Sequence, residues 1–276
     1  MSKCDKNKIT SGTKEWADTN VNCYFGCSND CRYCYAKKMA IRFKRKTEKN
    51  WKVMIPNEKV ITKNFKKRHG RVMFPSSHDI TPKSLENCII VLKRLLKAEN
   101  EVLITTKPNF SCIKRICDSF TEYRTLIQFR FTITSLNNEL LKFWEPNAPS
   151  YEERFESLKY AYNAGFKTSV SIEPFLDKNP IPLIKQLSPF VTESIWIGKM
   201  NYIRRNNFQG NYKKYYDLIR ENYGIENINL LLNEIKQITD CRINLKDSIK
   251  ILLSRYSKEK SINYFNKAIK PIPRYS

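Results

Sequence analysis

The sequence predicts an α/β protein, a partial (β/α)6 barrel with a short C-terminal helical extension. Short β-branched runs alternate with segments whose apolar residues recur at helical spacing. This alternation continues along most of the chain, so successive strands are joined by helical crossovers, which make right-handed parallel units. Six strands joined in this way make an open, curved parallel sheet, with the chemistry expected at the carboxyl ends of the strands.

The expected strands are short apolar runs that stop at proline, glycine or small polar residues. The first ends near Cys23. The run 101–108, EVLITTKP, shows the pattern well, because its β-branched residues are followed by a proline, which cannot continue a strand. The other expected strands lie within 70–77, 126–135, 167–175 and 193–201.

The expected helices repeat apolar residues at spacings of three and four. The clearest covers 81–100, which opens with the cap-like Thr81 and Pro82. The segment 150–166 carries Gly165 close to its end, where glycine commonly ends a helix. The other expected helices lie within 35–44, 109–120, 181–191, 215–224 and 244–257.

Composition indicates one folded domain. The chain has 276 residues, of which 41% are hydrophobic and 12% aromatic, so a disordered chain is excluded. No linker or repeat divides residues 1–276, so we expect a core over 18–201 and the helical extension over 202–276. No membrane-length apolar run or secretory signal is visible, which favours a cytoplasmic protein with reduced thiols. The nine cysteines are then expected to be metal ligands and buried single thiols.

The charge of the chain indicates a polyanionic partner. Fifty Lys and Arg oppose 27 Asp and Glu, a net charge of +23. A lysine-rich solvated surface would explain a mild excess, but residues 37–71 alone hold fourteen basic residues against two acidic ones. A second basic cluster, 201–216, is interleaved with aromatic residues, and this combination suits phosphates and stacked bases. The residues expected to contact nucleic acid are Tyr202, Arg204, Arg205, Phe208, Lys213 and Lys214.

A cysteine-rich loop, NCYFGCSNDCRYCYAKK, carries the strongest chemical signal. Cys27, Cys31 and Cys34 have the spacing C-x3-C-x2-C. Three thiolates on one loop can bind three irons of a [4Fe–4S] cluster and leave the fourth iron open. S-adenosylmethionine (SAM) can chelate that iron through its amino and carboxylate groups. One electron then breaks a carbon–sulfur bond and releases a 5′-deoxyadenosyl radical.

Two other interpretations of this loop stay open. Zinc sites usually combine two separate pairs of ligands, and here there is one group of cysteines with only His69 and His78 as imidazoles. A cluster that only transfers electrons would use Cys23 as its fourth ligand. We expect Cys23 instead to pack beside the cluster without binding iron.

With these motifs the chain resembles the radical SAM superfamily, and within it the spore photoproduct lyase-like branch. GCSNDCRYCYA resembles that branch's cluster loop, which has tyrosines on both sides of its last cysteine, here Tyr33 and Tyr35. ITTKP resembles its third-strand motif, and 132–174 resembles its fourth strand, helix and fifth strand. The resemblance covers about 22–201 and implies a [4Fe–4S] cluster, SAM and an external one-electron reductant of the flavodoxin or ferredoxin type.

Polar residues that follow the predicted strands are the candidates for holding SAM. Hydroxyls can bind ribose, and a carboxylate can pair with the SAM ammonium. The resemblance implies a lysine that contacts SAM after the third strand, where Lys107 stands. The expected SAM contacts are Ser76, Ser77, Asp79, Lys107, Thr134, Ser135 and Glu173.

One departure from the branch affects the reaction. Spore photoproduct lyases carry a hydrogen-donating cysteine in the loop after the second strand, where this chain has serine, in MFPSSHD. Tyr33 and Tyr35 are the alternative catalytic candidates. Three hypotheses follow: a radical SAM enzyme acting on DNA or RNA, a radical SAM enzyme acting on a small molecule or protein, and a nucleic-acid-binding protein with a structural cluster.

Overall fold

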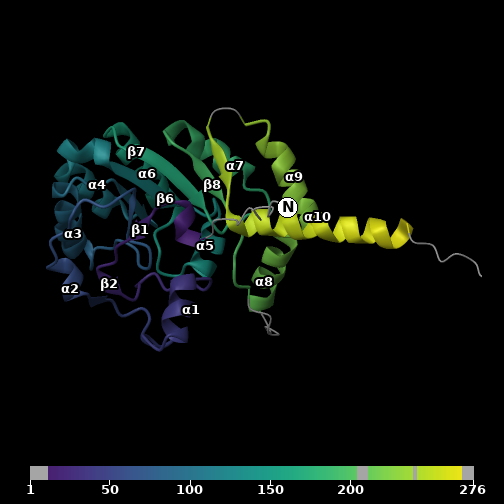
Figure 1. The fold of residues 1–276 in the computed structure, drawn as a ribbon, viewed down its shortest axis with the longest axis horizontal. Coiled ribbons are helices and arrows are strands. Elements are labelled where there is room, and N and C mark those ends of the chain that lie inside the picture. The colour runs from purple at the N-terminus through teal and green to yellow at the C-terminus, as the bar shows by residue number, and fades with distance from the viewer. Residues whose placement is uncertain (1–11, 204–210, 239–240, 269–276) are drawn as a thin grey trace, which may run out of the picture.

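The computed structural model describes residues 12–203, 211–238 and 241–268, and its centre is a parallel sheet flanked by helices (Figure 1). The sheet has seven strands in the order β1-β4-β5-β6-β7-β8-β9, and every pairing is parallel. The strands are β1 (Thr19–Asn20), β4 (Val72–Phe74), β5 (Val102–Thr106), β6 (Ile127–Thr132), β7 (Lys167–Ile172), β8 (Ile195–Ile197) and β9 (Ile243–Leu245).

Helices connect the strands, and further helices follow β8, which lies in the last strand segment predicted from the sequence. They are α1 (Tyr35–Arg42), α2 (Glu58–Ile61), α3 (Leu85–Lys97), α4 (Phe110–Ser119), α5 (Asn138–Trp144), α6 (Tyr151–Asn163), α7 (Ile181–Leu187), α8 (Asn211–Asn222), α9 (Ile225–Ile235) and α10 (Asp247–Ala268). Short 3-10 turns are η1 (Gly12–Glu15), η2 (Thr121–Leu126) and η3 (Ser188–Phe190). Among the described helices, none has the length and apolar composition to cross a bilayer.

The two faces of the sheet differ in chemistry. Alternate residues of β6, Phe129 and Phe131, join the apolar core together with helix residues such as Leu158. Residues on the opposite face are polar: Arg130 donates from Nε to the hydroxyl of Ser169 on β7, at 3.1 Å. One face of the sheet is therefore held by apolar packing, and the other carries buried polar groups.

The predicted α/β architecture is confirmed, and the structure adds elements that the pattern did not show. Just before Cys27, β2 (Tyr24–Phe25) pairs antiparallel with β3 (Ile55–Pro56), which precedes α2. The first sheet strand ends at Asn20, three residues before Cys23. The C-terminal extension is not only helical, because β9 pairs with β8 at the edge of the sheet. β2, β3 and β9 have only two or three residues each, too few to show a period of two, and none lies in a longer apolar run of the kind that marked the equally short β4 and β8.

Candidate active site

The three cysteines predicted to bind iron lie on the loop between β2 and α1. Gly26 lets the loop turn: its φ is +94°, and a Cβ there would stand 2.5 Å from the carbonyl oxygens of Trp51 and Val53. The amide of Cys27 donates to the Trp51 carbonyl at 3.1 Å. Cys34 is the N-cap of α1, and its sulfur accepts a backbone hydrogen bond from that helix at 3.4 Å. The loop is thus fixed at both ends by backbone contacts.

The surroundings of these thiols suit a bound cluster. Cys27 and Cys31 are buried, and Cys27 and Cys34 pack with Trp51 and two alanines of α1. Burial raises the pKa of all three thiols, so their thiolate forms need a compensating positive charge, which cluster irons supply. Among the described residues no three His, Cys, Asp or Glu side chains converge on one ion. A cubane cluster does not need such convergence, because each thiolate binds a different iron.

Cys23 lies apart from these thiols, in the core beneath the loop. Its sulfur is 3.6 Å from the sulfur of Cys88 on α3 and 3.8 Å from Nε2 of His78. The hydrogen bond with Cys88 outweighs burial and, with His78, lowers the pKa of Cys23 to about 6. The prediction that Cys23 does not bind iron stays a prediction, and the structure shows the partners that hold its side chain.

Asp79 joins the cysteine loop to the end of β5. Its Oδ1 accepts hydrogen bonds from the Lys107 amide at 2.7 Å and from the Thr106 hydroxyl at 3.1 Å. Its Oδ2 accepts a bond from Nδ2 of Asn29 at 2.8 Å, and its own amide donates to the Cys27 sulfur at 3.4 Å. Burial alone would raise the pKa of Asp79, but the Lys107 ammonium and these donors lower it below its usual value. Its predicted contact with SAM stays a prediction.

Lys107, directly after β5, offers a partly buried cation beside the cysteine loop. Its ammonium lies 5.5 Å from the centre of the Tyr33 ring and makes no hydrogen bond to a described residue. Burial lowers its pKa, but the negative charges of Cys31, Asp79 and Glu145 outweigh burial and raise the pKa above its usual value. The ammonium is therefore charged and free to bind a carboxylate, which is the role predicted for it towards SAM.

Glu145, a second carboxylate near Lys107, gave no signal in the sequence. Its Oε1 accepts bonds from the hydroxyls of Tyr33 and Thr134, the latter at 2.8 Å. Its Oε2 is 2.5 Å from Nη2 of Arg154, and both side chains are fully buried. Arg154 and the other donors outweigh burial and lower the pKa of Glu145. The EPNAPS stretch contains this glutamate, but no spacing rule connects it to Arg154 on the next helix.

The two serines after β4 are held by their backbone. The amides of Ser76 and Ser77 donate to Oδ1 of Asn22 at 2.7 and 2.8 Å, and the Asn22 amide group donates to the Ser76 hydroxyl at 2.9 Å. The hydroxyl of Tyr35 donates to the Ser76 carbonyl at 2.6 Å. These bonds tie the loop after β4 to the start of the cysteine loop and to α1.

Two further predicted SAM contacts follow β6 and β7. The Ser135 hydroxyl donates to Asp177. Glu173 follows β7, and its Oε2 is 4.0 Å from Nζ of Lys246, which also binds Glu15. Burial and the neighbouring carboxylates outweigh Lys246 and raise the pKa of Glu173 to about 7. Both residues thus stand at the carboxyl ends of strands, where the pattern placed them.

Comparison with known families decides what this constellation is. The family model described as the radical SAM superfamily matches residues 21–179, more than half of the chain. This chain belongs to the radical SAM superfamily. It is therefore an enzyme of a family that uses a [4Fe–4S] cluster and SAM, and the predicted membership is confirmed.

Similar proteins support the same assignment. An uncharacterized protein of Methanocaldococcus jannaschii is 30% identical over 159 residues, which are 56% of this chain and 60% of that protein. This chain thus spans about three fifths of that relative. A mutant of spore photoproduct lyase superposes with a TM-score of 0.54 at 13% identity, over 87% of this chain and 79% of that one. Spore photoproduct lyase complexed with dinucleoside spore photoproduct gives 0.50 at 14% identity, over 80% and 64%. At such identities these two structures support the radical SAM fold alone.

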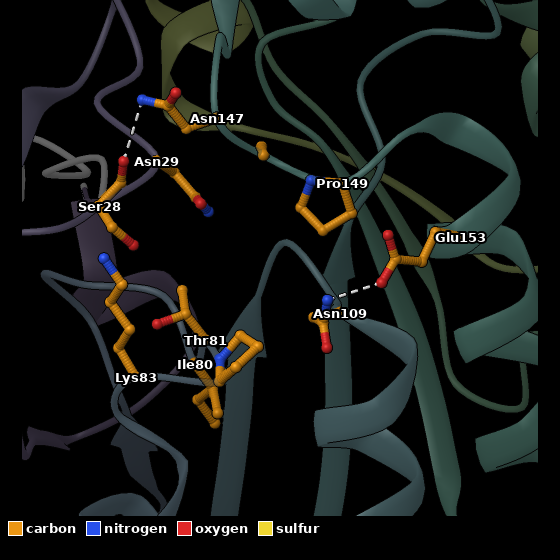
Figure 2. Close-up of a pocket in the computed structure, with 11 residues that line it drawn as sticks. Ser28, Asn29, Ile80, Thr81, Lys83, Asn109, Asn147, Pro149 and Glu153 are labelled. Carbon is orange, nitrogen blue, oxygen red and sulfur yellow. Dashed lines mark hydrogen bonds between the residues drawn. The ribbon is translucent and has the colours of Figure 1, made fainter.

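A pocket of about 390 Å³ lies beside the radical SAM cysteine loop (Figure 2). Ser28 and Asn29 of the loop stand on one side, and Asn109 and Glu153 stand on the other. Its polar groups mostly satisfy one another, because Glu153 accepts a bond from Nδ2 of Asn109 at 2.7 Å and Asn147 donates to the Ser28 carbonyl at 3.1 Å.

The residues predicted to bind nucleic acid are partly described. Tyr202 is 49% exposed, and the Lys38 ammonium lies 4.5 Å from its ring centre. Lys213 forms an ion pair with Asp217 at 3.0 Å, and the Lys214 ammonium lies 5.0 Å from the centre of the ring of its neighbour Tyr215. The remaining three predicted residues, Arg204, Arg205 and Phe208, lie outside the described residues.

Arg32 extends this surface, and the sequence analysis did not single it out. Its guanidinium carbon lies 4.8 Å from the ring centre of Phe143 and 5.2 Å from that of Tyr212. The Arg32 side chain also donates to the Phe143 carbonyl at 2.6 Å. Since Arg32 belongs to the cysteine loop and Lys38 to α1, both basic clusters of the sequence meet beside this loop. We call Arg32, Lys38, Tyr202 and Tyr212 the aromatic–cation rim.

Proposed function

We propose that this protein binds a [4Fe–4S] cluster through Cys27, Cys31 and Cys34, cleaves SAM to a 5′-deoxyadenosyl radical, and acts on a nucleic acid. The observation that carries the proposal is the position of the Lys107 ammonium. It is partly buried and charged, it donates no hydrogen bond to a described residue, and it lies near the thiols of Cys31 and Cys34 at the carboxyl end of β5. A zwitterionic ligand whose carboxylate pairs with this lysine fits that environment.

The residues around the site act by holding Lys107 and the loop in place. The bound cluster supplies the electron that breaks the SAM carbon–sulfur bond. Asp79 fixes the backbone of Lys107 and, through Asn29, the cysteine loop. Glu145, itself held by Arg154, supplies a second negative charge near the lysine. Lys107 would then bind the methionine carboxylate and orient SAM against the loop.

The other predicted contacts complete this proposal. Ser76, Ser77, Thr134, Ser135 and Glu173 all follow the carboxyl ends of β4, β6 or β7, where SAM would lie in an open α/β barrel. Several of their hydroxyls bind protein carboxylates or amides, so they can contact SAM through their free lone pairs or after local rearrangement.

The tyrosines beside the last cysteine are proposed to shape the radical site. The Tyr33 hydroxyl is bound to Glu145, and burial together with that carboxylate raises its pKa well above the usual value. The phenol therefore stays protonated. Tyr35 is 46% exposed and reaches the loop after β4. It is the better placed of the two to meet a substrate from outside.

The aromatic–cation rim supports a nucleic acid as substrate. Tyr202 and Tyr212 are 49% and 47% exposed, so a base can reach their rings, while the stacked cations remain close to phosphates. Spore photoproduct lyase, a structural neighbour, is solved with a dinucleoside photoproduct. A base inside a duplex cannot reach a buried radical, so we expect the target base to be unstacked.

The cluster and its chemistry can be tested with single cysteine variants. Anaerobically reconstituted protein should hold about four irons and four sulfides and, with dithionite, convert SAM to 5′-deoxyadenosine and methionine. Cys27→Ala, Cys31→Ala and Cys34→Ala should each lose the cluster, whereas the matched control Cys23→Ala should keep it. Loss of the cluster in Cys23→Ala with no SAM cleavage in the native protein would instead support an electron-transfer cluster.

The nucleic-acid substrate can be tested by binding. Affinity for single-stranded DNA or RNA should fall steeply as salt rises. Tyr202→Ala and Tyr212→Ala should each weaken binding by about 1–3 kcal/mol if a base stacks on the ring. Tyr162→Ala is the matched control, because Tyr162 is an exposed tyrosine on α6. Absence of binding to both polymers at low salt would favour a small-molecule or protein substrate.

A further inference from the structure

An exposed apolar patch lies on the antiparallel pair of β2 and β3, beside the cysteine loop. Phe25, Val53 and Ile55 are 46%, 53% and 50% exposed. Phe25 of β2 is paired directly with Ile55 of β3, so their side chains share one face. Figure 1 shows β2 at the periphery of the molecule, between α1 and α2. Three large apolar side chains exposed together are typical of a contact surface.

This patch lies close to the predicted iron ligands, both along the chain and in the packing of side chains. Phe25 is two residues before Cys27, and Gly26 between them packs against the carbonyls of Trp51 and Val53. The buried Trp51 side chain packs with Cys27 and Cys34. One layer of side chain and backbone therefore separates the patch from the thiols.

Positive charge surrounds the patch. Lys52 directly precedes Val53, Lys49 lies in the turn before it, and Lys59 follows β3 in α2; all three are exposed and form no ion pair with a described residue. The buried Lys46 donates to the Val53 carbonyl at 2.9 Å, which places a further cation under the patch. Two acids lie near the patch, Glu48 and Glu58. Glu48 forms an ion pair with Lys37 at 2.7 Å.

We propose that the patch of Phe25, Val53 and Ile55, with Lys49, Lys52 and Lys59 at its rim, is the docking surface for an acidic one-electron donor protein. The inference rests on the proposed function, because it needs a cluster at Cys27, Cys31 and Cys34. One electron leaves the reduced iron–sulfur centre of the donor and enters this cluster; no bond forms or breaks and no proton moves. The apolar centre supplies contact area, and the lysines attract and orient an acidic surface.

The position of the patch separates this partner from the nucleic acid. The aromatic–cation rim involves Arg32 and α1, on the far side of Cys31 in the sequence, whereas the patch lies before Cys27 and in the 49–59 segment. A nucleic acid would gain little from three exposed aliphatic and phenyl groups without a cation stacked on them. An acidic protein with an apolar contact face fits both features of the patch.

A plant-type [2Fe–2S] ferredoxin, a strongly acidic protein, serves as the probe. Its binding to reconstituted protein and its rate of cluster reduction are measured anaerobically, the latter by visible absorbance and electron paramagnetic resonance. Two variants are compared with the native protein: Val53→Glu/Ile55→Glu and Lys52→Glu/Lys59→Glu. Each should weaken ferredoxin binding and slow reduction at low ferredoxin concentration by about tenfold or more. Added salt should reduce the difference between native protein and the lysine variant.

Controls keep this result apart from the proposed function. Dithionite should reduce the cluster of both variants at the native rate, which shows that cluster and fold are intact. Ile90→Glu/Lys93→Glu places the same changes on the exposed face of α3 and should leave ferredoxin binding unchanged. Absence of a dithionite-reducible cluster in the native protein would overturn the proposed function itself.

Three outcomes would overturn the docking proposal while leaving the cluster in place. The first is ferredoxin reduction at the native rate in both variants. The second is loss of nucleic-acid binding, with ferredoxin reduction unchanged, in Lys52→Glu/Lys59→Glu. The third is a dimer of the native protein that dissociates in Val53→Glu/Ile55→Glu while electron transfer is unaffected, which would make the patch a self-association surface.

Discussion

Two groups of buried or partly buried charges, one beside the cysteine loop and one near β9, behave in opposite ways. Beside the cysteine loop, Asp79 and Glu145 each accept several hydrogen bonds and lie near a cation, and both have a lowered pKa. Near β9, Glu173 accepts no hydrogen bond from a described residue and shares Lys246 with two other acids. Its pKa is raised to about 7.

The difference shows that burial alone does not decide the state of a carboxyl group. All three carboxyls lose hydration, which favours the neutral form. For Asp79 and Glu145, oriented donors and a nearby cation replace the lost hydration, so these groups stay ionised and act as rigid supports. For Glu173 the replacement is incomplete, so this group can change its protonation near neutral pH.

The largest expected effect comes from breaking the buried ion pair between Glu145 and Arg154. Arg154→Met leaves Glu145 fully buried without its ion partner and should lower the free energy of unfolding by about 3–5 kcal/mol, measured by urea denaturation. The double variant Glu145→Gln/Arg154→Met should lose clearly less. Lys178→Met, which breaks the exposed pair with Glu221, should stay within about 1 kcal/mol of native. Equal losses in the single and double variants would show that charge compensation is not the reason.

The next effect concerns pH and Glu173. Its pKa is about 7 in the fold and 4.5 as the usual value, so the neutral form is favoured by folding. Its contribution is full below about pH 4.5 and is lost as pH rises through 7, a total of about 3 kcal/mol. Without SAM, Glu173→Gln should therefore unfold with a flatter pH dependence between pH 5 and 8 and gain stability relative to native at the upper end. Parallel curves for the two proteins would contradict the raised pKa.

The smallest expected effect tests Lys107 as a ligand for SAM. Lys107→Met should weaken SAM binding to the reconstituted protein by about 1.5–3 kcal/mol, the scale of one charge-assisted hydrogen bond, measured by anaerobic equilibrium dialysis. Lys83→Met is the control, because Lys83 lines the pocket beside the cysteine loop and makes no ion pair with a described residue. Unchanged SAM affinity in Lys107→Met would mean that its ammonium serves only to balance Asp79 and Glu145.

Much of the fold followed from local patterns. Long runs with a clear period, such as those that became α3, β5 and α6, were predicted because their buried faces recur at fixed spacing. The strands β2, β3 and β9 were not, since each has only two or three residues and none lies in a longer apolar run. The alternation of strand and helix was sufficient for the parallel sheet, but not for its seventh strand.

The sequence by itself determined the cysteine spacing, the charge excess and which residues follow each strand, because these depend only on order along the chain. Lys107 was identified in this way. Only the tertiary structure decided that Asp79 and Glu145 flank that lysine, that Arg154 compensates Glu145, and that Arg32 meets Tyr212 beside the loop. The physical reason is that hydrogen bonds and charge pairs act over a few ångströms in space, and the described residues that form them lie up to 235 positions apart in the chain.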